Sequence, residues 1–261
     1  MFLANAQDQW SSNYVARHTG IKGRWGGTGQ EVLLAGKNKI ADIFIGSEDA
    51  NILVLTDDSN GDALFVDDIF TALPESLTEH ESRIAQIDEI RAGAGDDIID
   101  MTSSKFAYAG HGGKISGSSG NDTIWANVGN NTLFGDSGND NIVGGTGNDV
   151  IVGGSGDDTL HGGGGRDIFC FGGNWGCDTV EQLANGEVIL WFESDSGIWD
   201  ASTLTYTDGE NSVTVTGVAA DKITLNFGND NDRYDELAGT GCFEESVNEK
   251  IFEDKNKGYL A

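Results

Sequence analysis

Aspartate or asparagine recurs at every ninth residue through the middle of this 261-residue chain, in glycine-rich surroundings. Six consecutive nonapeptides run without insertion from Gly117 to Cys170, and one of them reads Gly144-Gly-Thr-Gly-Asn-Asp-Val-Ile-Val152. An outlying copy spans residues 92–100, and residues 173–181 form another copy after a two-residue insertion. Carboxylate and carbonyl oxygens are hard ligands, which favour Ca²⁺ over Zn²⁺ or copper. The repeated turns are therefore suited to bind calcium.

Three kinds of position recur within each nonapeptide. Glycines at the first, second and fourth places permit positive φ and a tight turn whose carbonyl oxygens converge. The sixth place is acidic or an amide, and the eighth is large and apolar, as in Ile99, Ile124, Leu133, Ile142, Ile151, Leu160, Phe169 and Val180. Because strand side chains alternate, this pattern predicts a six-residue turn followed by a three-residue strand with one inward side chain.

One buried residue in nine gives a thin core, so each unit must stack on its neighbours. Stacking brings the carboxylates together in rows, and such rows repel unless a cation lies between them. The sequence thus predicts an all-β solenoid that depends on calcium. Residues 101–116 read as degenerate coils, in which Phe106 and Ile115 keep the apolar phase.

The tandem pattern Gly-Gly-x-Gly-x-Asp-x-apolar-x resembles the RTX family of hemolysin-type calcium-binding repeats. This resemblance directly covers about a third of the chain. It implies a right-handed parallel β-roll with two repeats per coil and Ca²⁺ held between the turns of repeats n and n+2.

The resemblance also implies which residues bind the ions. Sixth-place side chains would come from Asp97, Asp122, Asn131, Asp140, Asp149, Asp158, Asp167 and Asp178. First- and third-place carbonyls would come from Gly117, Ala126, Gly135, Gly144 and Gly153, and from Ser119, Val128, Ser137, Thr146 and Ser155. Second- and fourth-place carbonyls would come from Asp136, Gly145, Gly154, Gly163 and Asn174, and from Gly138, Gly147, Gly156, Gly165 and Gly176.

These assignments predict about five sandwiched Ca²⁺ ions, between the pairs Asp122 and Asp140, Asn131 and Asp149, Asp140 and Asp158, Asp149 and Asp167, and Asp158 and Asp178. Asn131 departs from the pattern because it carries no charge. Gly113 leaves the equivalent place in the preceding coil without a ligand. We therefore expect weak binding, or none, at that end.

Charge limits the classes of partner. The chain has 43 acidic and 15 basic residues, a formal net charge of −28 and 38% hydrophobic residues. Nucleic acid is excluded as a partner because a polyanion would be repelled. No stretch is apolar enough for a transmembrane helix, and no Sec-type signal peptide is visible. The three cysteines, Cys170, Cys177 and Cys242, allow at most one disulfide.

The flanking sequence suggests further divisions. We expect an N-terminal segment (1–37), an N-terminal β flank (38–91), the repeat roll (92–181), a C-terminal β cap (182–228) and an acidic tail (229–261). The flank reads as strands around an acidic hairpin, although Asp58, Asn60 and Asp62 imitate the start of an EF-hand loop without its later glycine and glutamate. In the cap, residues 187–192, 203–206, 212–216 and 222–227 read as strands, with a hairpin turn at Asp208 and Gly209.

The outer faces of the two expected sheets differ. Thr132, Phe134, Val150, Val152, Ile168 and Cys170 form an apolar stripe on one sheet. Such a stripe suggests cover by flanking strands or by a partner, and we favour cover by the chain itself.

No catalytic constellation stands out. HExxH and GxSxG motifs are absent, and Gly135-Asp-Ser-Gly138 resembles a protease motif only through the register of its nonapeptide. We expect a non-enzymatic, monomeric calcium-binding module of a secreted or surface protein, exported by type I secretion machinery that would read residues 229–261. Two alternatives stay open: a folding and export appendage of a secreted hydrolase, lyase or epimerase, and an adhesin that binds a surface glycan or protein.

Overall fold

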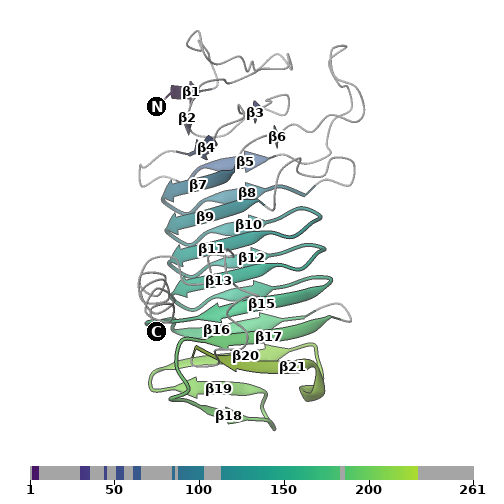
Figure 1. Ribbon diagram of the computed structural model, residues 1–261. Helices are drawn as coiled ribbons and strands as arrows, with labels where there is room; N and C mark the ends of the chain where they lie inside the picture. Colours follow the sequence, from purple (N-terminus) through teal and green to yellow (C-terminus); the bar gives the residue numbers. More distant parts are fainter. Residues whose placement is uncertain are drawn as a thin grey trace, which may run out of the picture.

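The computed structural model describes residues 2–5, 30–35, 44–45, 51–55, 61–65, 84–85, 88–102, 113–182 and 186–228. Two large sheets stack their strands along one axis, from β4 and β5 to β18 and β19 (Figure 1). Sheet I runs in the order β1 (Phe2–Asn5), β2 (Gln30–Ala35), β4 (Asn51–Val54), β7 (Glu89–Ala94), β9 (Lys114–Ser119), β11 (Thr132–Ser137), β13 (Val150–Ser155), β15 (Arg166–Phe171), β17 (Glu187–Phe192) and β21 (Ile223–Phe227).

Sheet II runs in the order β18 (Ile198–Asp200), β19 (Thr205–Asp208), β20 (Asn211–Thr216), β16 (Cys177–Glu181), β14 (Thr159–His161), β12 (Asn141–Val143), β10 (Thr123–Trp125), β8 (Ile98–Asp100) and β5 (Ala63–Phe65). A separate pair, β3 (Phe44–Ile45) and β6 (Ile84–Ala85), is also parallel. One 3₁₀ turn, Ala220–Lys222, precedes β21. No helix in the described part of the chain is long and apolar enough to cross a membrane.

Strand register confirms two nonapeptides per coil. Ile124 pairs with Ile142 in sheet II, and Leu133 pairs with Ile151 in sheet I, each a shift of one double repeat. All pairings within the repeats are parallel. The predicted all-β fold, a parallel β-solenoid, is confirmed.

The two strands of a coil differ in length, which the repeat pattern did not predict. Strands β9, β11 and β13 of sheet I span six residues, because they continue through the first three places of the following nonapeptide. Strands β10, β12 and β14 of sheet II span three. The expected six-residue turn therefore occurs only from sheet II to sheet I, and the expected three-residue strand occurs only in sheet II.

Eighth-place side chains fill the space between the sheets. Inward residues from Leu53 to Leu190 stack along sheet I, and residues from Leu64 to Val215 stack along sheet II. Every repeat residue that the sequence assigned to this row is fully buried. The core is therefore a narrow double column, one side chain wide on each sheet.

The N-terminal flank is not a hairpin. Strand β4 pairs in parallel with β7 in sheet I, whereas β5 pairs in parallel with β8 in sheet II. The two strands thus form a further coil on the roll. The sequence prediction failed because an acidic turn between two apolar strands is equally compatible with a hairpin and with a coil. Asp58 and Asn60 lie outside the described residues, as does Phe106.

Beyond residue 181 both sheets continue. β17 and β21 extend sheet I in parallel, and β20 pairs in parallel with β16. Strands β19 and β20 then turn back as the predicted hairpin, with Gly209 at φ 64°. The end of the core holds stacked rings: Phe192 lies 3.9 Å from Tyr206 and 5.3 Å from Phe171, centroid to centroid.

Three of the six residues of the apolar stripe on the outside of sheet I are buried, and Thr132, Val152 and Ile168 are half-buried. Phe134, Val150 and Cys170 are buried although they point away from the core, and Trp191 joins them. Cys170 is disulfide-bonded, whereas Cys177 is free and exposed. Cys242 and the rest of residues 229–261, including the expected secretion signal, lie outside the described residues.

Candidate metal-binding rows

Sixth-place residues of successive coils stack in two rows, one along each edge of the roll. The first row follows the turns from sheet I to sheet II and consists of Asp62, Asp97, Asp122, Asp140, Asp158 and Asp178. The second row follows the opposite turns and consists of Asn131, Asp149 and Asp167. All of these side chains are buried, at 5% exposure or less.

One carboxylate oxygen of each aspartate is held by the coil before it. The backbone N–H of Asp122 donates to Asp140 Oδ1 over 2.7 Å, and that of Asp140 donates to Asp158 Oδ1 over 2.8 Å. The same bond joins Asn131 to Asp149 and Asp149 to Asp167 in the second row. Each of the five residue pairs expected from the sequence is brought together in this way, the fifth being Asp158 and Asp178.

The other carboxylate oxygen, Oδ2, has no hydrogen-bond partner in Asp122, Asp140, Asp149, Asp158 and Asp178, although it is buried. In the first four of these aspartates it points beside the first-place glycine of the same repeat. A Cβ built on Gly135 would lie 2.2 Å from Asp140 Oδ2 and 2.4 Å from the carbonyl oxygen of Gly153 in the next coil. Two oxygens therefore converge on a space that any side chain would fill. At Gly135, glycine leaves this space open and is not needed for a positive φ.

Burial makes these carboxylates costly to ionise. Desolvation raises the pKa of Asp122, Asp140 and Asp149 to about 7 and that of Asp178 to about 8, against an ordinary 3.8. Repulsion from neighbouring carboxylates raises them further, while the backbone hydrogen bonds lower them. Unpartnered buried carboxylates in rows would be neutralised by a bound cation or by protons.

The chemistry of the donors suits calcium. The converging atoms are carboxylate and carbonyl oxygens, which are the ligands that Ca²⁺ prefers. Among the described residues, no three or more histidine, cysteine, aspartate or glutamate side chains form a metal-binding group. A calcium site here would thus rest on two carboxylates completed by backbone carbonyls.

Several of the expected carbonyl ligands already accept hydrogen bonds between coils. The fourth-place N–H of Gly120 donates to Ser137 O, that of Gly138 donates to Ser155 O, and that of Gly129 donates to Thr146 O. The second-place oxygen of Gly145 accepts from Gly164. A carbonyl oxygen has two lone pairs, so these bonds leave each oxygen one further ligand position. Their role as ligands stays a prediction.

Fourth-place glycines are fixed by close approach. Gly138 has φ 130°, and a Cβ there would lie 1.8 Å from the carbonyl oxygen of Gly120 in the coil before. Only glycine satisfies both conditions. This position therefore sets the spacing between coils and, with it, the spacing of the rows.

The fifth place has a role that the sequence reasoning missed. Exposed side chains there accept a hydrogen bond from the fifth-place N–H of the next coil, as Asn121 Oδ1 does from Asn139 N over 2.8 Å. Asn139 and Asp157 continue this outer row in the same direction. The sixth-place bonds run in the opposite direction. The signal was available, because the fifth place is asparagine or aspartate in nearly every repeat.

Asp62 is a second residue whose place the sequence did not reveal. Its backbone N–H donates to Asp97 Oδ1 over 2.6 Å, and Asp97 N donates to Asp122 Oδ1 over 2.7 Å. The first row thus extends beyond the tandem block. Wider spacing along the chain, 35 and 25 residues in place of 18, hid this continuity.

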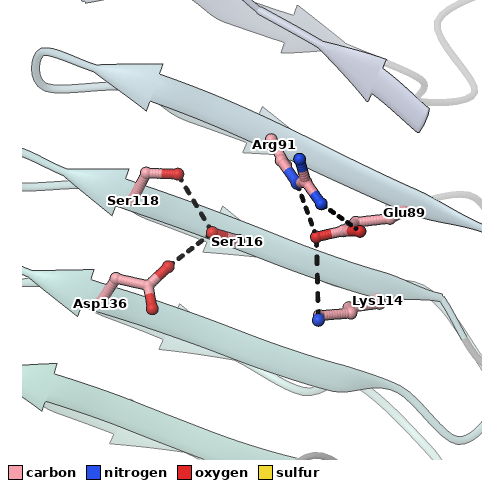
Figure 2. Close-up of polar contacts among 6 residues, drawn as sticks. All are labelled: Glu89, Arg91, Lys114, Ser116, Ser118 and Asp136. Carbon is pink, nitrogen blue, oxygen red and sulfur yellow. Dashed lines mark hydrogen bonds and ion pairs between the residues drawn. The ribbon is translucent and has the colours of Figure 1, made fainter. Parts of the chain in front are cut away.

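The outer face of sheet I carries a separate polar cluster on β7, β9 and β11 (Figure 2). Arg91 and Lys114 both contact Glu89, at 2.9 and 3.8 Å, so their charges are paired. Ser116 donates to Asp136 Oδ2 over 2.5 Å. Ser137 Oγ donates to the carbonyl of Ser118. Asp136 and Ser137 are the two polar residues of the protease-like sequence. They contact different partners and therefore do not form a pair of catalytic base and nucleophile.

The geometry defines a parallel β-roll whose coils are joined at their edges by rows of buried carboxylates. Comparison with known families agrees: the model of the RTX calcium-binding nonapeptide repeat matches the chain in four copies, over residues 85–100, 114–142 and 134–169. The chain therefore contains RTX calcium-binding repeats, and this part of it is a calcium-binding module. No curated protein matches the chain.

Proposed function

We propose that this chain is a non-enzymatic folding module whose β-roll forms when calcium binds between the sixth-place aspartates. The observation that carries the proposal is the set of buried Oδ2 atoms without a partner, of which those of Asp122, Asp140 and Asp149 each lie beside a first-place glycine and a carbonyl of the next coil. Bound calcium would balance the negative charge of these carboxylates.

The residues that would hold the ions follow from the rows. Asp122, Asp140, Asp158 and Asp178 would act in consecutive pairs along the first row, and Asp149 with Asp167 along the second. Asp97 would extend the first row toward the N-terminus. Each aspartate would contribute to two neighbouring sites, as its two oxygens face opposite coils.

Coupling between folding and calcium follows from the energetics. With free Ca²⁺ at ten times the dissociation constant, one site stabilises the folded state by about 1.4 kcal/mol. Together, several sites would contribute more free energy than the small difference that decides whether a marginally stable domain folds. Without calcium, the row carboxylates and the net charge of −28 oppose compaction.

Secretion fits this coupling. RTX repeats are typical of secreted proteins, and free Ca²⁺ is low in a cytosol and near millimolar outside cells. The chain would stay expanded before export, through a type I route, and would fold as a monomer outside or at the cell surface. No described residue favours catalysis: His161, the one histidine in the described ranges, faces Glu181 on the outside of sheet II.

Far-UV circular dichroism during a calcium titration tests the proposal, starting from protein freed of metal by a chelator. We expect strand signal to appear cooperatively with Ca²⁺ and not with an equal concentration of Mg²⁺, because Mg²⁺ demands a smaller, octahedral site. An unchanged spectrum and hydrodynamic radius after exhaustive chelation would refute it.

A further inference from the structure

The second row ends in a side-chain amide on both sides, and these amides occupy the places where a cation would otherwise be needed. Asn131 lies at one end, next to Asp149, and Gln182 lies at the other, next to Asp167. Both are buried, at 4% and 1% exposure. The first row has no such residue between Asp122 and Asp178.

Asn131 Nδ2 is surrounded by oxygen atoms. It donates to the carbonyls of Gly129 at 2.8 Å, Asn127 at 3.2 Å and Gly144 at 3.2 Å, and it lies 3.1 Å from Asp149 Oδ1. All four neighbours are acceptors, so the atom among them must be the amide nitrogen and not the oxygen. These oxygens are of the same kinds as the expected calcium ligands.

The comparison with an aspartate turn identifies what the amide replaces. In the first row, Asp140 Oδ2 faces the first-place carbonyl of the next coil, that of Gly153, which places two acceptors together. In the second row, Asn131 Nδ2 faces the equivalent carbonyl, that of Gly144, and donates to it. The contact that requires a cation in one row is an ordinary hydrogen bond in the other.

Gln182 makes the matching contact beyond Asp167. Its Nε2 donates to the second-place carbonyl of Gly163 over 3.1 Å. A Cβ on Gly186 would lie 2.2 Å from this nitrogen and 2.4 Å from the carbonyl oxygen of Gly165, so the nitrogen also lies near the fourth-place carbonyl. A hydrogen bond from Gln182 also lowers the pKa of Asp167, against the rise caused by burial.

We infer that Asn131 and Gln182 are built-in substitutes for calcium, and that the second row holds a single ion, between Asp149 and Asp167. This inference rests on the proposed calcium binding, and it differs from the expectation of a sandwiched ion between Asn131 and Asp149. It makes the two edges of the roll unequal: the first edge needs calcium at each step, whereas the second is closed by amides at both ends.

Native mass spectrometry of the full chain at saturating Ca²⁺ tests the inference through the number of bound ions. Asn131→Asp places a carboxylate where the amide lies, and we expect one more ion than in the unaltered protein. In the copy at residues 92–100, alanine at the first place (Ala92) occurs together with a buried aspartate at the sixth place (Asp97). Ala126 is the first-place residue of the repeat that contains Asn131, so it should likewise be compatible with an aspartate at position 131. Gln182→Glu is expected to add one ion at the other end.

Asn130→Asp is the matched control. It makes the same charge change one residue away, on an exposed side chain whose Oδ1 accepts from Asn148 N, and an aspartate would keep that bond. We expect its ion count to equal that of the unaltered protein. In a calcium titration, Asn131→Asp should fold at a higher calcium concentration than Asn130→Asp, because it loses a donor to three carbonyls.

An unchanged ion count in Asn131→Asp overturns the inference for that residue, as does a variant that stays unfolded in calcium while Asn130→Asp folds. An unchanged count in Gln182→Glu overturns it for Gln182. Anomalous scattering from crystals of the unaltered protein grown in calcium gives a test without substitution: an ion beside Asn131 Nδ2 refutes the inference. If the unaltered protein binds no calcium at all, the proposed function itself fails.

Discussion

The backbone N–H of Asp140 donates to Asp158 Oδ1 over 2.8 Å, across the boundary between two coils. The bond fixes the carboxylate so that its second oxygen faces the first-place glycine of its own repeat, Gly153, at 2.1 Å from the Cβ that a larger residue would place there. Each coil thus orients the ligand of the next one. Metal sites in such a row are linked to each other through the backbone, which predicts cooperative filling.

Asp158→Ala should raise the calcium concentration at the midpoint of folding. The substitution removes the carboxylate from the two sites that share Asp158, together with the acceptor for Asp140 N–H, and it introduces no side-chain amide. We expect a loss of at least about 1.4 kcal/mol at a free Ca²⁺ ten times the dissociation constant, equal to one site. Circular dichroism in a calcium titration measures the midpoint.

The neighbouring variant Asp157→Asn is the control for that measurement. Asp157 is exposed, and its Oδ1 accepts from Cys177 N over 2.9 Å, a bond that asparagine can also make. We expect no shift of the midpoint beyond the small effect of removing one exposed charge. Equal shifts from the two variants would contradict the assignment of the sixth place to the metal.

Gly135→Ala should disrupt the first row without altering its charges. The added Cβ would lie 2.2 Å from Asp140 Oδ2 and 2.4 Å from Gly153 O, and we expect a loss of about 1–3 kcal/mol, typical of overpacking. Gly164→Ala is the control, since its Cβ would meet only Thr146 Cγ2, at 3.8 Å. Urea unfolding in saturating calcium measures both, and an equal loss would show that the first-place glycine has no special role.

Calcium-free protein should become more stable as the pH falls from 8 to 5. Burial raises the pKa of Asp178 to about 8 and that of Asp122 and Asp140 to about 7 in the folded state, while the unfolded chain keeps an ordinary value of 3.8. The folded state therefore binds more protons, so its stability decreases as the pH rises through this window. Thermal unfolding in a chelator at several pH values measures the trend.

Saturating calcium should reverse this dependence, because protons then compete with the ion for the same oxygens. Asp178→Asn should reduce the pH dependence of the calcium-free protein, since it removes the carboxyl with the pKa of about 8. Calcium-free stability that increased with pH between 5 and 8 would be inconsistent with buried, unpartnered row carboxylates.

Phe192→Ala should destabilise the C-terminal end of the roll in saturating calcium. Phe192 stacks against Phe171, Tyr206 and Phe227, and removing a buried phenyl ring costs about 3–5 kcal/mol. Ile198→Ala, on a side chain that is 76% exposed, should have little effect. Urea unfolding of both variants in saturating calcium provides the test; an equal effect of the two would mean that the stacked rings do not stabilise the roll.

The nonapeptide determined an all-β solenoid and its buried eighth-place core, because the same apolar place recurs in every repeat. The parallel roll with two repeats per coil and the stacking of particular aspartates were implied by the resemblance to the RTX family, and the register agrees with them, since it repeats every 18 residues from Asp122 to Asp158. The C-terminal strands and the turn at Gly209 followed from ordinary alternation and turn chemistry. Local pattern was sufficient wherever the coil length was constant.

Tertiary structure decided what depends on contacts between coils of unequal length. Asp62 joins the first row across a gap of 35 residues, and the strands around it form a coil where the sequence suggested a hairpin. The amide nitrogen of Asn131 contacts four oxygens on two coils, and three of these oxygens are backbone carbonyls. Gln182 lies outside the repeats, and its amide occupies the other end of the same row. Such contacts depend on how coils stack in three dimensions, which residue spacing along the chain does not encode.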